Sequence, residues 1–97
     1  DEKVIKKKWN AEAQKGLEAF SLALSGRPGI ISTEIQDLYQ STLSGAGINP
    51  GKVMQILRLA ITGQGSGPDL MKIIELIGVN KTVYRINQAI IALNNTK

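Results

Sequence analysis

The chain has 97 residues, 42% hydrophobic and 21% charged, which is the composition of one globular domain rather than of a disordered segment. It contains no cysteine and no histidine, so disulfides, thiolate or imidazole metal ligands and the usual general base are excluded. Twelve Lys and Arg against eight Asp and Glu give a net charge of +4, and this balance favours a binding module with a polyanionic partner over an enzyme.

The first half of the chain predicts two helices. Over 5–24 apolar residues recur at three- and four-residue steps, and Pro28 lies beyond the end of this pattern. A second helix is predicted over 33–44, where Thr33 and Gln36 have the spacing of a capping box. The apolar stripe of the first helix consists of Ile5, Trp9, Ala13, Leu17, Phe20 and Leu24. Trp9 and Phe20 lie on this stripe and are therefore predicted to pack in the core.

The second half predicts three further helices, over 50–62, 68–77 and 80–93, the first two followed by Gly63 and Gly78. Their N-terminal signals are Asn49 with Pro50, Pro68 with Asp69, and Asn80. No stretch alternates with a period of two for long enough to form a sheet. The sequence predicts an all-α fold, a compact bundle of about five helices with short Gly/Pro-rich loops, as one domain over 1–97.

The segment from 63 to 69 places three glycines at alternate positions and leads into a helix N-terminus. Glycines let a ligand approach the main chain closely, and free N–H groups at a helix start favour anions. A nucleotide-binding P-loop is excluded, because that motif follows a strand and ends in Gly-Lys-Ser/Thr, whereas this loop follows a helix and ends in Gly-Pro-Asp. The alternative is a flexible connection between helices that binds no ligand.

The helix before this loop has a polar side. On a helical wheel Arg58 lies away from the apolar cluster, with Thr62 one turn further on and Gln55 nearby. A guanidinium offers five donors in a rigid fork, which suits base edges or phosphate. The alternative is that Arg58 is an ordinary solvated residue.

Lysines at 3 and 6–8 form a basic cluster near the start of the chain. We interpret Lys6, Lys7 and Lys8 as auxiliary phosphate contacts, with a solvated helix end as the alternative. Acidic pairs such as Glu34 with Asp37 lack metal-ligand spacing, so no metal site is predicted.

The second half of the chain resembles a known family. Residues 51–63, GKVMQILRLAITG, are similar to a signature in the C-terminal part of bacterial glutamyl-tRNA synthetases. The continuation SGPDL at 66–70, then IELIG at 74–78 and Arg85-Ile86, follows the same family pattern in order and without gaps. The resemblance covers 48–93, whereas residues 1–47 are compatible by helix pattern only.

This resemblance implies an anticodon-binding subdomain of a class I ligase that joins glutamate to its tRNA with ATP and Mg²⁺. The chain contains neither catalytic signature of that class, so by itself it is expected to be catalytically silent and to hold no cofactor. Its implied partners are glutamate tRNA and the remainder of the synthetase chain. A cytoplasmic monomer without membrane contact is expected.

The resemblance also implies site residues, because Arg58, Gly67, Pro68 and Leu70 match family positions that lie against the second and third anticodon bases. Bases in a single-stranded loop can be splayed out and recognised on their Watson–Crick edges. The complete set of candidate anticodon-binding residues is Arg58, Thr62, Gly63, Gly67, Pro68 and Leu70. The alternative function is a helical protein-interaction module that does not recognise RNA.

Overall fold

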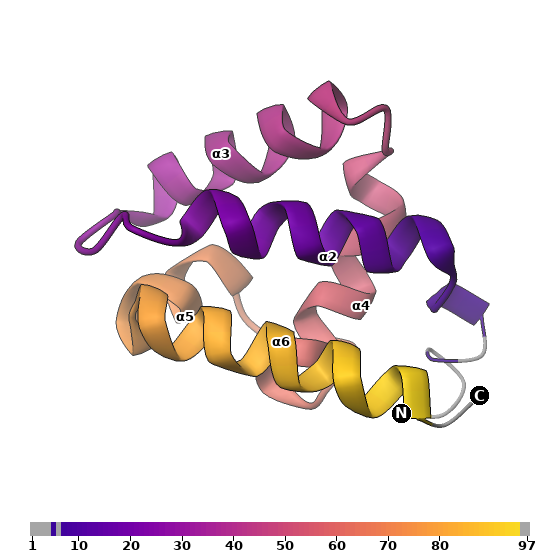
Figure 1. The fold of residues 1–97 in the computed structure, drawn as a ribbon. Coiled ribbons are helices and arrows are strands. Elements are labelled where there is room, and N and C mark those ends of the chain that lie inside the picture. Colours follow the sequence, from indigo (N-terminus) through magenta and orange to yellow (C-terminus); the bar gives the residue numbers. More distant parts are fainter. Residues whose placement is uncertain (1–4, 6, 96–97) are drawn as a thin grey trace.

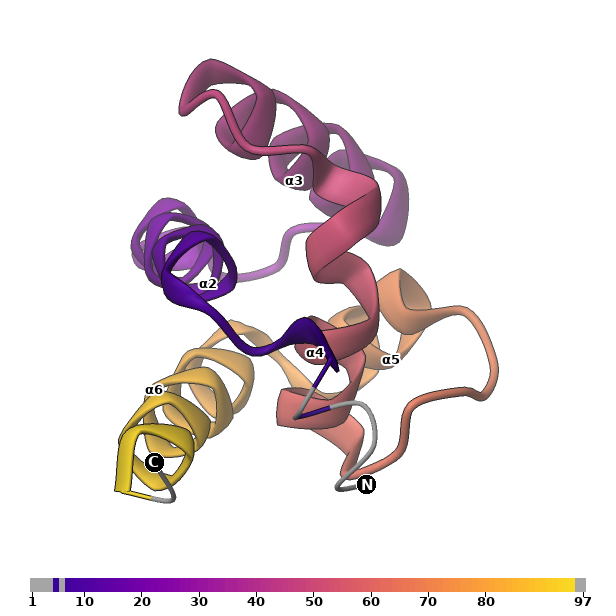
Figure 2. The same cartoon turned by 90° about the vertical axis from the view of Figure 1, so that its right-hand side faces the viewer.

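The computed structural model describes residue 5 and residues 7–95, and within this part of the chain it contains helices and no strand. The helices are α2 (Ala11–Leu24), α3 (Ser32–Gly45), α4 (Pro50–Thr62), α5 (Leu70–Ile77) and α6 (Val79–Asn95). Helix α2 lies between α3 and α6, and α4 crosses behind this layer at a steep angle (Figures 1 and 2). The all-α bundle predicted from the sequence is confirmed.

The first helix is shorter than predicted. Asn10 has an extended backbone and its side chain accepts a hydrogen bond from the Ala13 N–H at 2.8 Å, so α2 begins only at Ala11. The single helix predicted over 5–24 is therefore wrong at its start, because the cap bond of Asn10 competes with helical continuation. Ile5 and Trp9 nevertheless pack against the core, as their positions on the apolar stripe predict.

The predicted capping box at the start of α3 is also wrong. The helix begins at Ser32, which leaves Thr33 inside the first turn. The Glu34 carboxylate accepts from the Ile31 N–H at 3.2 Å, and the Glu75 carboxylate of α5 accepts from the Ser32 N–H at 2.5 Å. Two carboxylates thus accept from the N–H groups of Ile31 and Ser32 and complement the positive end of the helix.

Helix α4 begins and ends where the sequence predicts. Asn49 is the N-cap, and its side chain accepts from the Gly51 N–H at 2.9 Å, with Pro50 as the first helical residue. Gly63 adopts φ 79°, a left-handed conformation that closes the helix with a bond from its N–H to the Leu59 carbonyl. These local signals fix both ends of the element that carries the candidate site.

The last two helices each differ from the prediction at the N-terminus. Helix α5 begins at Leu70, so Pro68 lies outside it, and Asp69 is the N-cap, accepting from the Met71 N–H at 2.9 Å. Helix α6 begins at Val79 directly after Gly78, which places Asn80 inside the helix rather than at its cap.

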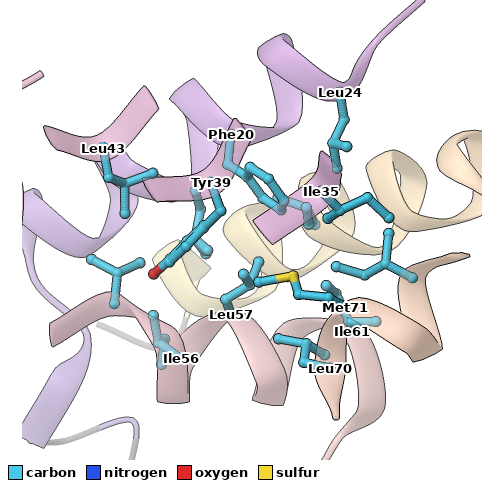
Figure 3. Packing of buried hydrophobic residues seen from close by; sticks show 14 of the residues in the cluster. Phe20, Leu24, Ile35, Tyr39, Leu43, Ile56, Leu57, Ile61, Leu70 and Met71 are labelled. Atoms are coloured by element: carbon cyan, nitrogen blue, oxygen red, sulfur yellow. The ribbon is translucent and has the colours of Figure 1, made fainter. Parts of the chain in front are cut away.

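The core forms where the inner faces of all five helices meet (Figure 3). Phe20 of α2 meets Tyr39 of α3 edge to face, with ring centroids 5.1 Å apart and an interplanar angle of 86°. The Tyr39 hydroxyl donates to the Pro50 carbonyl at 2.6 Å, which ties α3 to the start of α4. Burial raises the pKa of Tyr39, so this phenol remains a protonated donor. The core placement predicted for Phe20 is confirmed, since it is fully buried.

Helices α2 and α4 approach each other closely at Gly16. A Cβ atom added there would lie 3.2 Å from Cγ2 of Val53, which is tighter than ordinary van der Waals contact. The absence of a side chain at Gly16 therefore permits this crossing, and it brings the first turn of α4 next to the first half of α2.

Candidate nucleic-acid interface

Helix α4 has one buried face and one polar strip that leads to the glycine-rich loop. Gln55, Arg58 and Thr62 are half-buried and recur at three- and four-residue steps, so they follow one line along the helix. The opposite face of the helix supplies core residues, namely Val53, Ile56, Leu57 and Ile61. This arrangement agrees with the helical wheel drawn from the sequence, and the strip ends where the loop of residues 63–69 begins.

Arg58 and Gln55 hold main-chain carbonyl groups of this loop. Nη1 of Arg58 donates to the Pro68 carbonyl at 2.6 Å, and Nε2 of Gln55 contacts the Gly65 carbonyl at 3.4 Å. Both bonds span ten residues of sequence, so they fold the loop back along the helix that precedes it. The loop is therefore fastened to α4.

Thr62 fastens the beginning of the loop. Its hydroxyl lies 2.8 Å from the Arg58 carbonyl and 3.2 Å from the Gln64 carbonyl, both of which are acceptors for its single proton. The same oxygen accepts from the Gln64 N–H at 3.2 Å. Because the hydroxyl lies within hydrogen-bond distance of both the N–H and the carbonyl of Gln64, it fixes the direction in which the chain leaves α4.

The direction of these carbonyl groups determines where the neighbouring N–H groups point. In a trans peptide the C=O and the N–H lie in one plane and point in opposite directions, and the described chain has no cis peptide. The carbonyls of Gln64, Gly65 and Pro68 face α4, so the N–H groups of Gly65, Ser66 and Asp69 face away from it. No described residue accepts a hydrogen bond from these three N–H groups. The loop thus offers a set of main-chain donors beside the guanidinium of Arg58.

The other candidate residues differ in their access to a ligand. Gly63, Gly67 and Pro68 are exposed, and Gly67 adopts φ 151°, a conformation that favours glycine. Leu70, by contrast, is only 2% exposed and packs in the core. The structure therefore brings Arg58, Thr62 and the glycine loop together at the surface, whereas the side chain of Leu70 supports the loop from beneath.

Charged groups define the edges of this surface. Asp69 places its own carboxylate at the start of α5, where it accepts from Met71, so the N-terminus of this helix already has an anionic cap. Arg85 of α6 donates from Nη1 to the Ile61 carbonyl at 2.9 Å, at the C-terminal end of α4. The contact of Arg85 with Ile61 joins residues 24 positions apart, so no local sequence pattern indicates it.

The two lysines of the basic cluster that the structure describes, Lys7 and Lys8, lie at the opposite end of α4 from the loop. Lys3 and Lys6 fall outside the described residues, whereas Lys7 is exposed and Lys8 is half-buried. Both described lysines line a small hollow together with Lys52 of α4.

Residues 5 and 7–95 contain no group of three or more Asp, Glu, His or Cys side chains that would hold a metal ion. None of the helices in this part of the chain has the length and hydrophobicity needed to cross a membrane.

Replacing Thr62 by valine is expected to loosen the loop while leaving the bundle intact. The substitution leaves the Gln64 N–H without its acceptor, at a cost of about 0.5–1.5 kcal/mol. Hydrogen exchange should show loss of protection at Gln64 in Thr62→Val. Thr82→Val is the matched control, because Thr82 also bonds a carbonyl four residues earlier but lies on α6. Equal Gln64 protection in both variants would contradict the role of Thr62.

A helical domain that presents main-chain N–H groups of a surface loop beside an arginine of the preceding helix has the features of a nucleic-acid-binding module. Comparison with known protein families agrees, since the family model described as an anticodon binding domain matches residues 1–90. The chain belongs to this family of anticodon-binding domains. The match also covers the first half of the chain, for which the sequence analysis had only a compatible helix pattern.

Individual relatives have a consistent description. The chain is 42% identical over 95 residues to a glutamate–tRNA ligase of Cytophaga hutchinsonii and 37% identical over 93 residues to one of Flavobacterium johnsoniae. Among solved structures, a glutamate tRNA ligase from Elizabethkingia meningosepticum in complex with its amino acid superposes with a TM-score of 0.86 at 34% identity and covers 96% of this chain. The chain spans only 18% of the length of each of these proteins.

Proposed function

We propose that this domain binds the anticodon of glutamate tRNA, recognising its second and third bases, as part of a glutamate–tRNA ligase. Three things support the proposal: membership of the anticodon-binding family, relatives described as glutamate–tRNA ligases, and the donor groups of the loop. The observation that carries the proposal is the fastening of the loop to α4, which turns its N–H groups outward beside Arg58.

The chemistry of the bases fits these donors. Glutamate anticodons end in U and C, and cytosine presents acceptors at O2 and N3 to which a guanidinium can donate. Arg58 donates one N–H to the Pro68 carbonyl, and its other N–H groups remain available to donate to such a base edge. Uracil presents two carbonyl acceptors, which match main-chain N–H groups of the kind found at Ser66 and Asp69. Pro68, which lacks an N–H, supplies an exposed apolar surface for a base.

The remaining functions belong to parts of the ligase outside this chain. We propose that the parent enzyme uses ATP and Mg²⁺ to attach glutamate to the tRNA, and that the present domain contributes binding and no chemistry. Its partners are then glutamate tRNA and the rest of the synthetase chain, within a cytoplasmic monomer. The family and the named relatives favour this proposal over the alternative of a protein-interaction module, and tRNA binding that weakens with salt would distinguish RNA recognition from it.

Replacing Gly67 by valine tests the loop directly. A β-branched residue at φ 151° costs about 1–3 kcal/mol in backbone strain, and its Cβ would lie 3.5 Å from Nη1 of Arg58. We expect the affinity for a glutamate anticodon stem-loop, measured by fluorescence anisotropy, to fall about tenfold or more, which corresponds to ~1.4 kcal/mol.

The matched control is Gly29→Val, because Gly29 also has a positive φ, at 78°, but lies in the loop between α2 and α3. Circular-dichroism melts should show similar losses of stability for the two variants, while only Gly67→Val loses affinity. An equal loss of affinity in Gly29→Val would show that reduced stability alone explains the effect and would count against the proposal.

A further inference from the structure

A small hollow of about 190 Å³ lies where the starts of α2 and α4 meet. Lys7 and Lys8 line it from the segment before α2, and Lys52 lines it from the first turn of α4. The close approach of the two helices at Gly16 makes this meeting possible, and the extended backbone of Asn10 separates the two N-terminal lysines from α2. The fold thus gathers three ammonium groups from two segments more than 40 residues apart.

The charges in this hollow are not balanced. Glu12 is the acidic residue among those lining it, against three lysines. None of these four side chains forms an ion pair or hydrogen bond with a described residue, so no group in this part of the chain occupies the lysine donors. Like charges confined to a small hollow repel one another, and a bound anion relieves that repulsion. A lysine ammonium is a point charge well suited to phosphate.

The hollow and the glycine loop lie at the two ends of one helix. At about 100° per residue, Lys52 lies about 60° around α4 from Gln55 and about 120° from Arg58. Lys52 precedes Arg58 by six positions, which corresponds to about 9 Å along the helix axis, and the loop begins about 16–17 Å from Lys52. One RNA strand that crosses α4 obliquely therefore reaches both places.

We propose that the hollow lined by Lys7, Lys8 and Lys52 is a second site on this domain, which binds a backbone phosphate of the RNA independently of its sequence. The proposal rests on the proposed function, because it names a further contact of the same RNA. The two sites have different roles, since phosphate contacts position a nucleic acid and base contacts give specificity. The loop discriminates between RNAs, and the hollow strengthens the binding of all of them.

The test is the salt dependence of binding by the 97-residue chain. Dissociation constants are measured by anisotropy at several KCl concentrations for two stem-loops, one with the glutamate anticodon and one with its last two anticodon bases changed. Lys52→Gln is expected to lower the affinity for both RNAs by the same factor, about 3- to 10-fold. The log of the association constant falls as log salt concentration rises, and Lys52→Gln should make this dependence less steep by about 0.7–0.9, which corresponds to one lost phosphate contact. The ratio of the dissociation constants for the two RNAs should not change.

Lys81→Gln is the matched control, because it removes the same charge from an exposed position on α6 that does not line the hollow. A salt slope equally changed in Lys52→Gln and Lys81→Gln would overturn the phosphate site, as would an unchanged slope in Lys52→Gln. A change in the ratio between the two RNAs would also overturn it, by showing that Lys52 recognises sequence. A wild-type chain that binds both stem-loops with equal affinity would contradict the proposed function, and this result is distinguishable from failure of the phosphate site. A wild-type chain with no salt-dependent affinity for either RNA would overturn both proposals.

Discussion

Replacing Arg58 by alanine is expected to lower the affinity for a glutamate anticodon stem-loop about 10- to 100-fold, which corresponds to ~1–3 kcal/mol. Two losses add up in this variant. The donors available to the third anticodon base disappear, and the Pro68 carbonyl loses the 2.6 Å bond that fastens the loop to α4. Isothermal titration with stem-loops that differ only at the third base should show that discrimination for C falls together with affinity.

Two further variants separate these losses. Arg58→Lys keeps the positive charge but lacks the planar fork, so it should retain part of the affinity and little of the discrimination. Arg27→Ala is the control for removing an arginine, because Arg27 bonds a carbonyl of α2 far along the chain from the loop. Equal losses for Arg58→Ala on every RNA, whatever its third base, would contradict a base-recognition role for Arg58.

Replacing Phe20 by alanine is expected to be the most damaging change to the fold. Phe20 is fully buried and packs edge to face on Tyr39, so its loss leaves a cavity between α2 and α3. Truncations of this kind cost about 3–5 kcal/mol, and a domain of this size has only about 5–15 kcal/mol to lose. Urea denaturation should show a correspondingly lower midpoint.

Leu22→Ala on the same helix provides the comparison for Phe20→Ala. Leu22 is 78% exposed, so its truncation should change the free energy of unfolding by less than about 0.5 kcal/mol. A loss in Leu22→Ala as large as that in Phe20→Ala would mean that α2 does not bury the face described above.

Local signals were sufficient to predict much of the fold. Asn49, Pro50 and Gly63 fix the ends of α4 through bonds to near neighbours, and the apolar periodicity identifies the faces that form the core. The starts of other helices were not predictable in this way. The Ser32 N–H at the start of α3 donates to the carboxylate of Glu75, which lies 43 positions further along the chain. Such a distant partner has no signature in the local sequence.

The candidate site shows the same division. The wheel of α4 placed Arg58 and Thr62 on one strip, and the glycines marked the loop. The bonds of Arg58 and Gln55 to loop carbonyls require the loop to fold back, which spacing alone does not reveal. Burial of Leu70 depends on where α5 packs, and the meeting of Lys52 with the N-terminal lysines depends on the crossing at Gly16.

The most direct test of anticodon recognition is an NMR titration of the isotope-labelled chain with the glutamate anticodon stem-loop and with a second stem-loop whose last two anticodon bases are changed. We expect the first RNA to shift the signals of Arg58, Thr62 and residues 63–70, and the second RNA to leave the loop signals nearly unchanged. Loop signals that shift equally with both RNAs, or with neither, would contradict recognition of the anticodon by this domain.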